Sequence, residues 1–321
     1  MARRKKGSPI HGWVALDKPK GMTSTQAVAL VRRIYDAQKA GHAGTLDPLA
    51  TGLLPIALGE ATKTVPFVME RDKVYRFVIR WGEARTTDDA EGEATAISDV
   101  RPSPAAIEAT LTQFIGAIWQ TPPRFSAIKI DGERAYDIAR EGGEVDLEPR
   151  LVEIYEAAYL GSSDPDHAEL EVTCGKGTYI RSLARDLAEK LGTCGHVGEL
   201  RRTRVGPFGE AAAISLSELE ALGQSARHLK CLLPVETVLD DIPALAVTGD
   251  QAARLRQGRS VIVRPQAFLG ETERQGVIAL GASADPEDEE PDLAYAMERG
   301  RLVALGEIIR GEFHPTRVFR I

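Results

Sequence analysis

The chain has 321 residues, of which 43% are hydrophobic and 27% are charged, a composition typical of a globular protein with room for one large and one small domain. It has no run of about 18 apolar residues, and its basic N-terminus lacks the apolar region of a secretory signal, so we expect a cytoplasmic protein without a membrane span. The three cysteines and six histidines do not stand at metal-ligand spacings, so we expect reduced thiols and no metal.

The formal net charge of −7 argues at first against a nucleic-acid partner, because phosphate binding normally requires a basic surface. Six acidic residues, however, stand together in "DPEDEEPD" at 285–292, and the remainder of the chain is nearly neutral. Basic clusters lie at 3–6 and in "ELRRTRV" at 199–205. A solvated face or tail explains each cluster taken alone, so a cluster indicates nucleic-acid binding only together with another signal.

In chain order, "GWVALDK" (12–18) predicts a strand that ends in a Lys-Pro-Lys-Gly turn. "STQAVALVRRIYDA" (24–37) predicts a helix with Ser24 as its N-cap. After a glycine-rich stretch, the alternating segment "KVYRFVIRWG" (73–82) predicts a strand with both faces in use. A polar loop at 86–93 and an amphipathic helix at 104–116 follow.

Further along, "FSAIKIDGERAYDIAREG" (125–142) predicts a strand, a turn at Asp131-Gly132 and a helix, and two more strands are predicted at 151–160 and 167–175. "GTYIRSLARDLAEKLG" (177–192) gives the clearest helix pattern, with Thr178 as N-cap. Because hairpin-type links alternate irregularly with helical ones, we expect an α+β fold with a mixed, largely antiparallel sheet. After about residue 240 the helical content falls, which indicates a separate small β-rich unit.

One acidic residue in this sequence needs an explanation of its own. "GHAGTLDPLATGLLPIALGEATK" (41–63) places Asp47 in a run of otherwise small and apolar residues. A carboxylate in such surroundings requires either a partner or a chemical task. The structural alternative is a turn former before Pro48.

Five segments stand in a distinctive order: "GWVALDKPKGMTS", "GHAGTLDPLATGLLPIALGEATK", "KVYRFVIRWG", "CGKGTYIRSLARDLAEKLG" and "HVGELRRTRVG". In these segments, over about residues 10–240, the chain resembles the TruB family of bacterial tRNA pseudouridine synthases. The resemblance implies a basic N-terminal tail at 1–10, a pseudouridine synthase catalytic domain at 11–246 and a PUA-like RNA-binding domain at 247–321. The acidic insertion at 285–292 departs from a basic RNA-binding surface.

The resemblance also implies an activity: uridine 55 in the T-loop of tRNA is flipped out and isomerised to pseudouridine. The N-glycosidic bond is broken, the uracil turns, and the bond is remade through carbon, without a metal or an organic cofactor. The expected partner is the T-arm stem-loop of tRNA, with no membrane partner, and we expect a monomer. Because a protein that extrudes a T-loop base must disturb tRNA tertiary contacts, a secondary role in tRNA folding is a further hypothesis.

The site residues implied by the resemblance lie in the same segments. Asp47 would be the catalytic nucleophile, Arg181 its ionic partner, and Tyr75 a ring that stacks on the uracil and a candidate for proton transfer. Tyr179 and Leu200 would line the pocket, and His42 would fill the gap that the flipped nucleotide leaves. Phosphate contacts are expected from basic residues of these segments, namely Lys18, Lys20, Lys63, Arg201 and Arg202.

Three classes of function remain to be separated at this point. A carboxylate can act as a nucleophile or stabilise an oxocarbenium-like centre, and whether Asp47 attacks the uracil or the ribose stays open. A hydrolase would need a second acid close by to activate water, and a phosphate-binding metabolic enzyme would need a glycine-rich phosphate loop. The main alternative is therefore a non-catalytic tRNA-binding or folding factor that uses the same pocket.

Overall fold

The structure is a computed structural model that describes residues 7–126, 128–130, 133–135, 138, 141, 143, 145–223, 228–264, 267–269 and 292–321. The basic cluster at 3–6 and the turn predicted at Asp131-Gly132 lie outside the described residues, as does most of the helix predicted after that turn. Of the acidic insertion at 285–292, only Asp292 is described. No helix of the described residues is long and apolar enough to cross a membrane.

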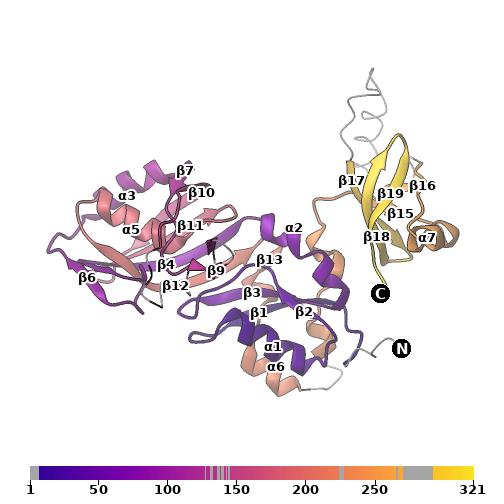
Figure 1. Ribbon diagram of the computed structural model, residues 1–321, viewed down its shortest axis with the longest axis horizontal. Helices are drawn as coiled ribbons and strands as arrows, with labels where there is room; N and C mark the ends of the chain where they lie inside the picture. The colour runs from indigo at the N-terminus through magenta and orange to yellow at the C-terminus, as the bar shows by residue number, and fades with distance from the viewer. Residues whose placement is uncertain are drawn as a thin grey trace.

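A mixed sheet of ten strands runs through the larger part of the molecule (Figure 1). Its main path follows the order β14-β1-β3-β12-β4-β11-β10-β7, with β2 paired to β3 and β13 paired to β12. The strands are β1 (Gly12–Lys18), β2 (Ala40–His42), β3 (Thr51–Leu58), β4 (Lys73–Trp81), β7 (Gly116–Gln120), β10 (Arg150–Gly161), β11 (His167–Cys174), β12 (Gly195–Val205), β13 (Phe208–Gly209) and β14 (Ile214–Ser215). Only the β1–β14 and β3–β12 pairs are parallel, which confirms the predicted mixed, largely antiparallel sheet.

Short helices and two small hairpins complete this part of the chain. The α-helices are α1 (Ser24–Ile34), α2 (Val65–Glu70), α3 (Pro104–Leu111), α5 (Ile180–Lys190) and α6 (Leu216–Leu222). The 3-10 helices are η1 (Gly59–Lys63), η2 (Thr112–Phe114), η3 (Glu210–Ala212), η4 (His228–Cys231) and η5 (Val235–Val238). The hairpins are formed by β5 (Glu83–Arg85) with β6 (Ala94–Ile97), and by β8 (Lys129–Ile130) with β9 (Glu133–Arg134).

Strand β4 shows how alternation along the sequence sets the fold. Its residues Lys73, Tyr75, Phe77, Ile79 and Trp81 are buried, while the residues between them are half-buried or exposed. The four hydrophobic side chains among them belong to a core that they share with α1, with α5 and with the inner residues of β10 and β11. One face of the central strands is therefore committed to the core, and Tyr75 lies on that face.

Both predicted N-caps were wrong by one residue. Helix α1 is capped by Thr23, whose hydroxyl accepts a hydrogen bond from Gln26 N while the Gln26 side chain accepts one from Thr23 N. This reciprocal arrangement is a capping box, and it leaves Ser24 free for another contact. Helix α5 has Tyr179 at its N-cap, without a side-chain cap, because the Thr178 hydroxyl donates instead to the carbonyl of Gly175.

A second sheet forms the C-terminal unit, in the order β15-β17-β18-β19-β16. Its elements are β15 (Ala244–Ala246), α7 (Gly249–Arg256), β16 (Val261–Ile262), β17 (Asp292–Glu298), β18 (Arg301–Ile309) and β19 (Glu312–Val318). Strand β15 pairs with β17, so this sheet begins before residue 247, where the sequence placed the start of the last domain. The division into domains itself stays a prediction.

The C-terminal sheet packs against the larger unit at the end that carries α2 and β13, far from α3 and β7 (Figure 1). Leu302, Leu305 and Phe319 join a buried apolar cluster with Trp13 of β1 and Leu53 of β3. Because these strands belong to the two different sheets, one hydrophobic core extends across both units.

Candidate active site

Asp47 lies in the loop between β2 and β3, and this loop is fastened by backbone contacts on both sides of the acid. The Ser24 hydroxyl donates to the carbonyl of Leu46 and accepts from its N–H, both at 2.9 Å. Ala50 N donates to Asp47 O at 3.1 Å, and Gly21 N donates to Pro48 O at 2.7 Å. The backbone around Asp47 is therefore held by α1 and by the turn after β1.

Arg181, in the first turn of α5, supplies the partner that the Asp47 carboxylate requires. Its Nε lies 2.9 Å from Asp47 Oδ2. Its two terminal nitrogens donate to the carbonyls of Thr87 and Phe125, each at 2.9 Å, which fixes the plane of the guanidinium. The Arg181 side chain is only 6% exposed, whereas that of Asp47 is 36% exposed, so the carboxylate is the accessible member of the pair.

A second carboxylate stands behind the arginine. Asp89 Oδ2 lies 3.7 Å from Arg181 Nε, and its side chain is buried. Its other oxygen accepts from the Thr87 hydroxyl at 2.5 Å and from Glu91 N at 3.0 Å. Sequence reasoning treated the segment 86–93 only as a polar loop and missed this residue, because nothing in the pattern shows that the loop folds back onto α5.

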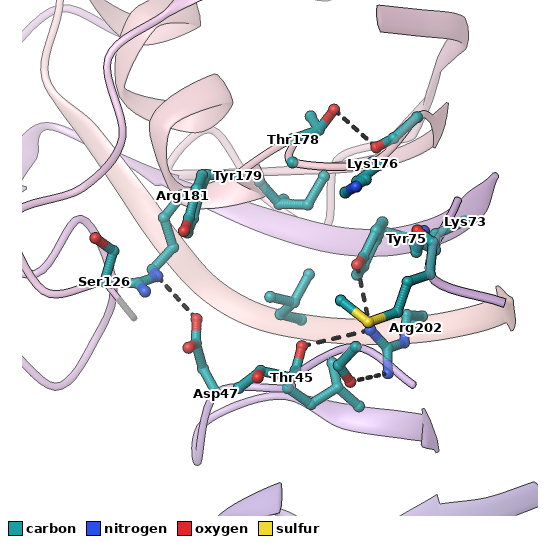
Figure 2. A pocket seen from close by; sticks show the side chains of 17 residues that line it. Thr45, Asp47, Lys73, Tyr75, Ser126, Lys176, Thr178, Tyr179, Arg181 and Arg202 are labelled. Atoms are coloured by element: carbon teal, nitrogen blue, oxygen red, sulfur yellow. Dashed lines mark hydrogen bonds and ion pairs between the residues drawn. The ribbon is translucent and has the colours of Figure 1, made fainter. Parts of the chain in front are cut away.

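The ion pair opens into a cavity of about 320 Å³, shown in Figure 2. Tyr75, Tyr179 and Leu200 contribute rings and an aliphatic side chain to its lining, and residues 175–178 contribute to the wall near α5. This volume is in the range of small-molecule sites. An apolar chamber with one accessible carboxylate at its edge suits a flat, uncharged ring whose attached atoms must meet that carboxylate.

Tyr75 enters the cavity from β4. Burial raises the pKa of its phenol, so the hydroxyl keeps its proton at neutral pH. The hydroxyl oxygen lies 3.5 Å from Arg202 Nη1, and the guanidinium carbon lies 6.0 Å from the centre of the tyrosine ring. The hydroxyl therefore faces a fixed positive charge.

Arg202 does not occupy the position expected of a phosphate-binding residue. Its side chain is almost completely buried on β12. Nε donates to Leu53 O at 2.8 Å, and the terminal nitrogens donate to Gly44 O at 3.1 Å and to Thr45 O at 3.4 Å. The guanidinium is occupied by the protein's own carbonyls, which corrects the expectation of a phosphate contact.

Two of the predicted phosphate-binding lysines are likewise engaged within the protein. Lys18 is fully buried, and its ammonium donates to Pro19 O at 2.9 Å and Met22 O at 2.8 Å. Burial lowers the pKa of Lys18 to about 8. Lys63 contacts Glu60 and the carbonyl of Val318, both at 2.6 Å, so it lies at the contact with the C-terminal sheet rather than at the cavity.

The other predicted binding residues lie nearer to solvent. Arg201 pairs with Asp17 at 2.9 Å and with Glu210 at 2.7 Å, and together with Lys20 it borders a second cavity that shares Leu200 with the first. His42 lies on β2 and does not line the first cavity. Burial and the nearby Arg202 charge lower the pKa of His42, so this imidazole is neutral at pH 7.

Lys73 is a cavity residue that sequence reasoning missed. It lies on β4, two positions before Tyr75 and on the same face, and its ammonium donates to Met69 O at 2.8 Å and to Arg71 O. Burial lowers the pKa of Lys73 to about 8. The alternation of residues along β4 indicates this position, because a lysine two residues from a buried residue of the same strand points to the same buried face. No group of three or more potential metal ligands occurs among the described residues.

Two family profiles match successive parts of the chain. The profile described as "TruB family pseudouridylate synthase (N terminal domain)" matches residues 32–180, and the one described as "tRNA pseudouridylate synthase B C-terminal domain" matches residues 181–240. A protein named tRNA pseudouridine synthase B from Caulobacter vibrioides is 56% identical over 321 residues, which cover 100% of both chains. A protein of the same name from Bradyrhizobium diazoefficiens is 54% identical over 317 residues, which cover 97% of this chain and 86% of that one.

Solved structures share the fold. The structure described as "Crystal Structure of a Cbf5-Nop10-Gar1 Complex" matches with a TM-score of 0.68 and 25% identity, covering 96% of this chain and 84% of that one. A second, described as "Structure of H/ACA RNP bound to a substrate RNA containing 2'-deoxyuridine", matches with a TM-score of 0.68 and 23% identity, covering 100% and 91%. The two tRNA pseudouridine synthase B relatives are 56% and 54% identical to this chain and cover nearly all of it. The chain therefore belongs to the TruB family of pseudouridine synthases and is an isomerase.

Proposed function

We propose that this pseudouridine synthase isomerises uridine 55 in the T-loop of tRNA and that Asp47 is its nucleophile. The observation that carries the proposal is the ion pair between Asp47 and Arg181 at the edge of a cavity lined by Tyr75, Tyr179 and Leu200. The names of the relatives supply the tRNA substrate. Lys20, which is exposed, and Arg201, which is partly exposed, both border the neighbouring cavity and are proposed to contact phosphates of the T-arm.

The target base has to leave the RNA stack before it can reach Asp47. Extruding a base costs a few kcal/mol, and stacking it on an aromatic side chain returns about 1–3 kcal/mol. Tyr75 and Tyr179 supply two such rings on the cavity wall. His42, neutral at pH 7, is proposed to fill the space that the nucleotide leaves in the RNA, because an uncharged ring can stack between bases.

The reaction is balanced within the nucleotide. The bond from ribose C1′ to uracil N1 breaks, a bond from C1′ to uracil C5 forms, the proton on C5 leaves, and N1 gains a proton. Asp47 forms a transient covalent bond or an ion pair with the electrophilic carbon, and Arg181 holds the carboxylate that results when the bond is released. No co-reactant is needed, which fits the proposal that the enzyme uses no cofactor.

Tyr75 is the group proposed to move the proton from C5. Because its phenol is protonated at neutral pH, it can accept the C5 proton only as it passes its own proton to solvent, from which N1 gains its proton. The Arg202 guanidinium, 3.5 Å from the hydroxyl, would stabilise negative charge that develops on the phenol oxygen during this transfer. We further propose that the enzyme acts as a cytoplasmic monomer and that base extrusion also helps tRNA to refold.

The test uses an unmodified tRNA transcript tritiated at uracil C5, incubated with the purified chain in the presence of a chelator. Isomerisation releases the C5 label, so we expect about one tritium per tRNA, confined to the T-loop. Asp47→Asn should abolish release while tRNA affinity stays within a few fold, and Asp99→Asn, at an exposed site, should release at the normal rate. Tight tRNA binding without release by the native chain would favour the binding-factor alternative instead.

A further inference from the structure

Arg202 contacts four oxygen atoms on three segments of the chain. Two are the carbonyls of Gly44 and Thr45, in the loop that carries Asp47. The third is the carbonyl of Leu53 on β3, and the fourth is the hydroxyl of Tyr75 on β4. One buried side chain thus touches both the loop of the proposed nucleophile and the proposed proton-transfer group, as Figure 2 shows.

A buried cation needs a reason to be there. Removing an ion from water costs several kcal/mol unless its hydrogen-bonding groups are satisfied inside the protein. The four partners of Arg202 are neutral oxygens, so Arg202 forms no ion pair with them. Its hydrogen bonds therefore serve to hold these oxygens in place as well as to satisfy its charge. A planar guanidinium presents five N–H groups in fixed directions and can set the relative positions of several acceptors at once.

Two glycines with positive φ lie against Arg202. At Gly52 (φ +96°) an added Cβ would lie 2.3 Å from the carbonyl oxygen of Arg202, so β3 and β12 approach each other at a point that admits only glycine. Gly44 also has a positive φ, of +96°, and an added Cβ there would lie 3.4 Å from Arg202 Nη1. The Gly52 contact is with the Arg202 backbone and sets how closely β3 and β12 approach, whereas at Gly44 an added Cβ would be in van der Waals contact with the guanidinium itself.

We propose that Arg202 is a positioning residue that fixes the Asp47 loop relative to the Tyr75 hydroxyl. The inference rests on the proposed roles of Asp47 and Tyr75 and adds a residue that acts through them. Without the guanidinium, the carbonyls of Gly44 and Thr45 lose their donor. The loop and the Tyr75 hydroxyl then no longer share a contact that sets their relative positions. The charge has a second effect, because Arg202 opposes the rise that burial causes in the pKa of Tyr75.

Lysine is the informative replacement. Its ammonium keeps the positive charge, but its three N–H groups radiate from one atom and cannot reach all the acceptors that are spread around the edge of the guanidinium. Displacements of about 1 Å at an active site can cost on the order of 100-fold in rate. We therefore expect Arg202→Lys to lower the single-turnover rate of tritium release by about 100-fold, with tRNA affinity within about threefold of the native value.

The experiment measures single-turnover release, tRNA affinity and thermal unfolding for Arg202→Lys and Arg202→Gln. Arg80→Lys, at an exposed position on β4, is the matched control and should behave like the native chain. A native-like release rate in Arg202→Lys, or a loss confined to tRNA affinity, would overturn the proposal. Absence of a folding transition in both Arg202 variants would also overturn it, since the residue would then serve stability alone.

A double variant separates positioning from general damage. If Arg202 acts through the Tyr75 hydroxyl, then Tyr75→Phe should slow release much less in the Arg202→Lys background than in the native chain. Fully multiplicative losses would contradict the coupling. Failure of the proposed function is recognised separately, because in that case the native chain itself would release no T-loop tritium.

Discussion

Arg181 joins the loop that carries Asp47 to two other parts of the chain with one side chain. Nε faces Asp47, while the terminal nitrogens donate to the carbonyls of Thr87 and Phe125. The two carbonyls fix the guanidinium plane through the terminal nitrogens and so hold its charge beside Asp47, whereas lysine offers a single point of charge. The identity of the cation at this position, and not only its sign, should therefore matter for turnover.

Arg181→Lys should reduce turnover by about 100-fold or more and leave tRNA affinity within a few fold, because the charge is kept while the alignment with Asp47 is lost. Multiple-turnover tritium release and filter binding measure the two quantities. The Arg80→Lys control should change neither. A lysine variant with a near-native kcat would show that only the charge is required and that the contacts to Thr87 and Phe125 are structural.

At the same scale, sequence reasoning identified one ion pair but not the burial of several basic residues. The resemblance implied the Asp47–Arg181 pair, and the structure has these side chains 2.9 Å apart. It could not show that Lys18 and Arg202 are buried, since a basic residue in a motif looks the same whether its donors face phosphates or backbone carbonyls. That difference is decided by how distant segments such as 44–53 and 199–205 fold together.

Among the elements, helix α1 holds the loop of Asp47 through Ser24, a role that its sequence pattern does not indicate. Ser24 was predicted as the N-cap, yet Thr23 and Gln26 form the capping box. The Thr-x-x-Gln spacing of these two residues is a recognised capping signature and selects Thr23 over Ser24. Ser24 is thereby free to bridge the N–H and the carbonyl of Leu46, one residue before Asp47.

Ser24→Ala should destabilise the protein by about 1–3 kcal/mol, because it leaves a buried N–H and a buried carbonyl of Leu46 without their partner. It should also slow tritium release, since the loop of Asp47 loses its attachment to α1. Urea unfolding and single-turnover release test the two effects. Thr25→Ala, at the exposed next position, is the matched control. Equal stability of the two variants would show that water replaces the hydroxyl without cost.

At the scale of the whole molecule, the fold class was predictable and the contact between the two units was not. Alternating strands and irregular connections indicated α+β, which the large mixed sheet confirms. The fall in helical content after about residue 240 predicted a separate C-terminal unit. In the structure, Leu302, Leu305 and Phe319 of that unit share a core with Trp13 and Leu53. Contacts between residues about 250 positions apart leave no periodic signal, so neither propensity nor spacing reveals them.

The last residues of the chain hold this contact in place. Phe319 is buried in the shared core, and the Lys63 ammonium lies 5.5 Å from the centre of its ring. The same ammonium bonds to the carbonyl of Val318, and Arg320 N donates to the Glu60 carboxylate at 2.9 Å. Lys63, predicted from the sequence to meet a phosphate, is thus a link between η1 and the C-terminal segment.

Phe319→Ala should therefore destabilise the protein by about 3–5 kcal/mol, the usual cost of removing a buried phenylalanine, while Ile321→Ala, at a half-exposed position, should cost little. Because the core is shared, we expect one cooperative calorimetric transition at a lower temperature, rather than early melting of the C-terminal sheet alone. Two separated transitions in the variant would show that the sheets fold independently. In that case Lys63 and Phe319 would hold together two stable units, and the loss of this contact would leave the proposed T-loop isomerisation by the larger unit unchanged.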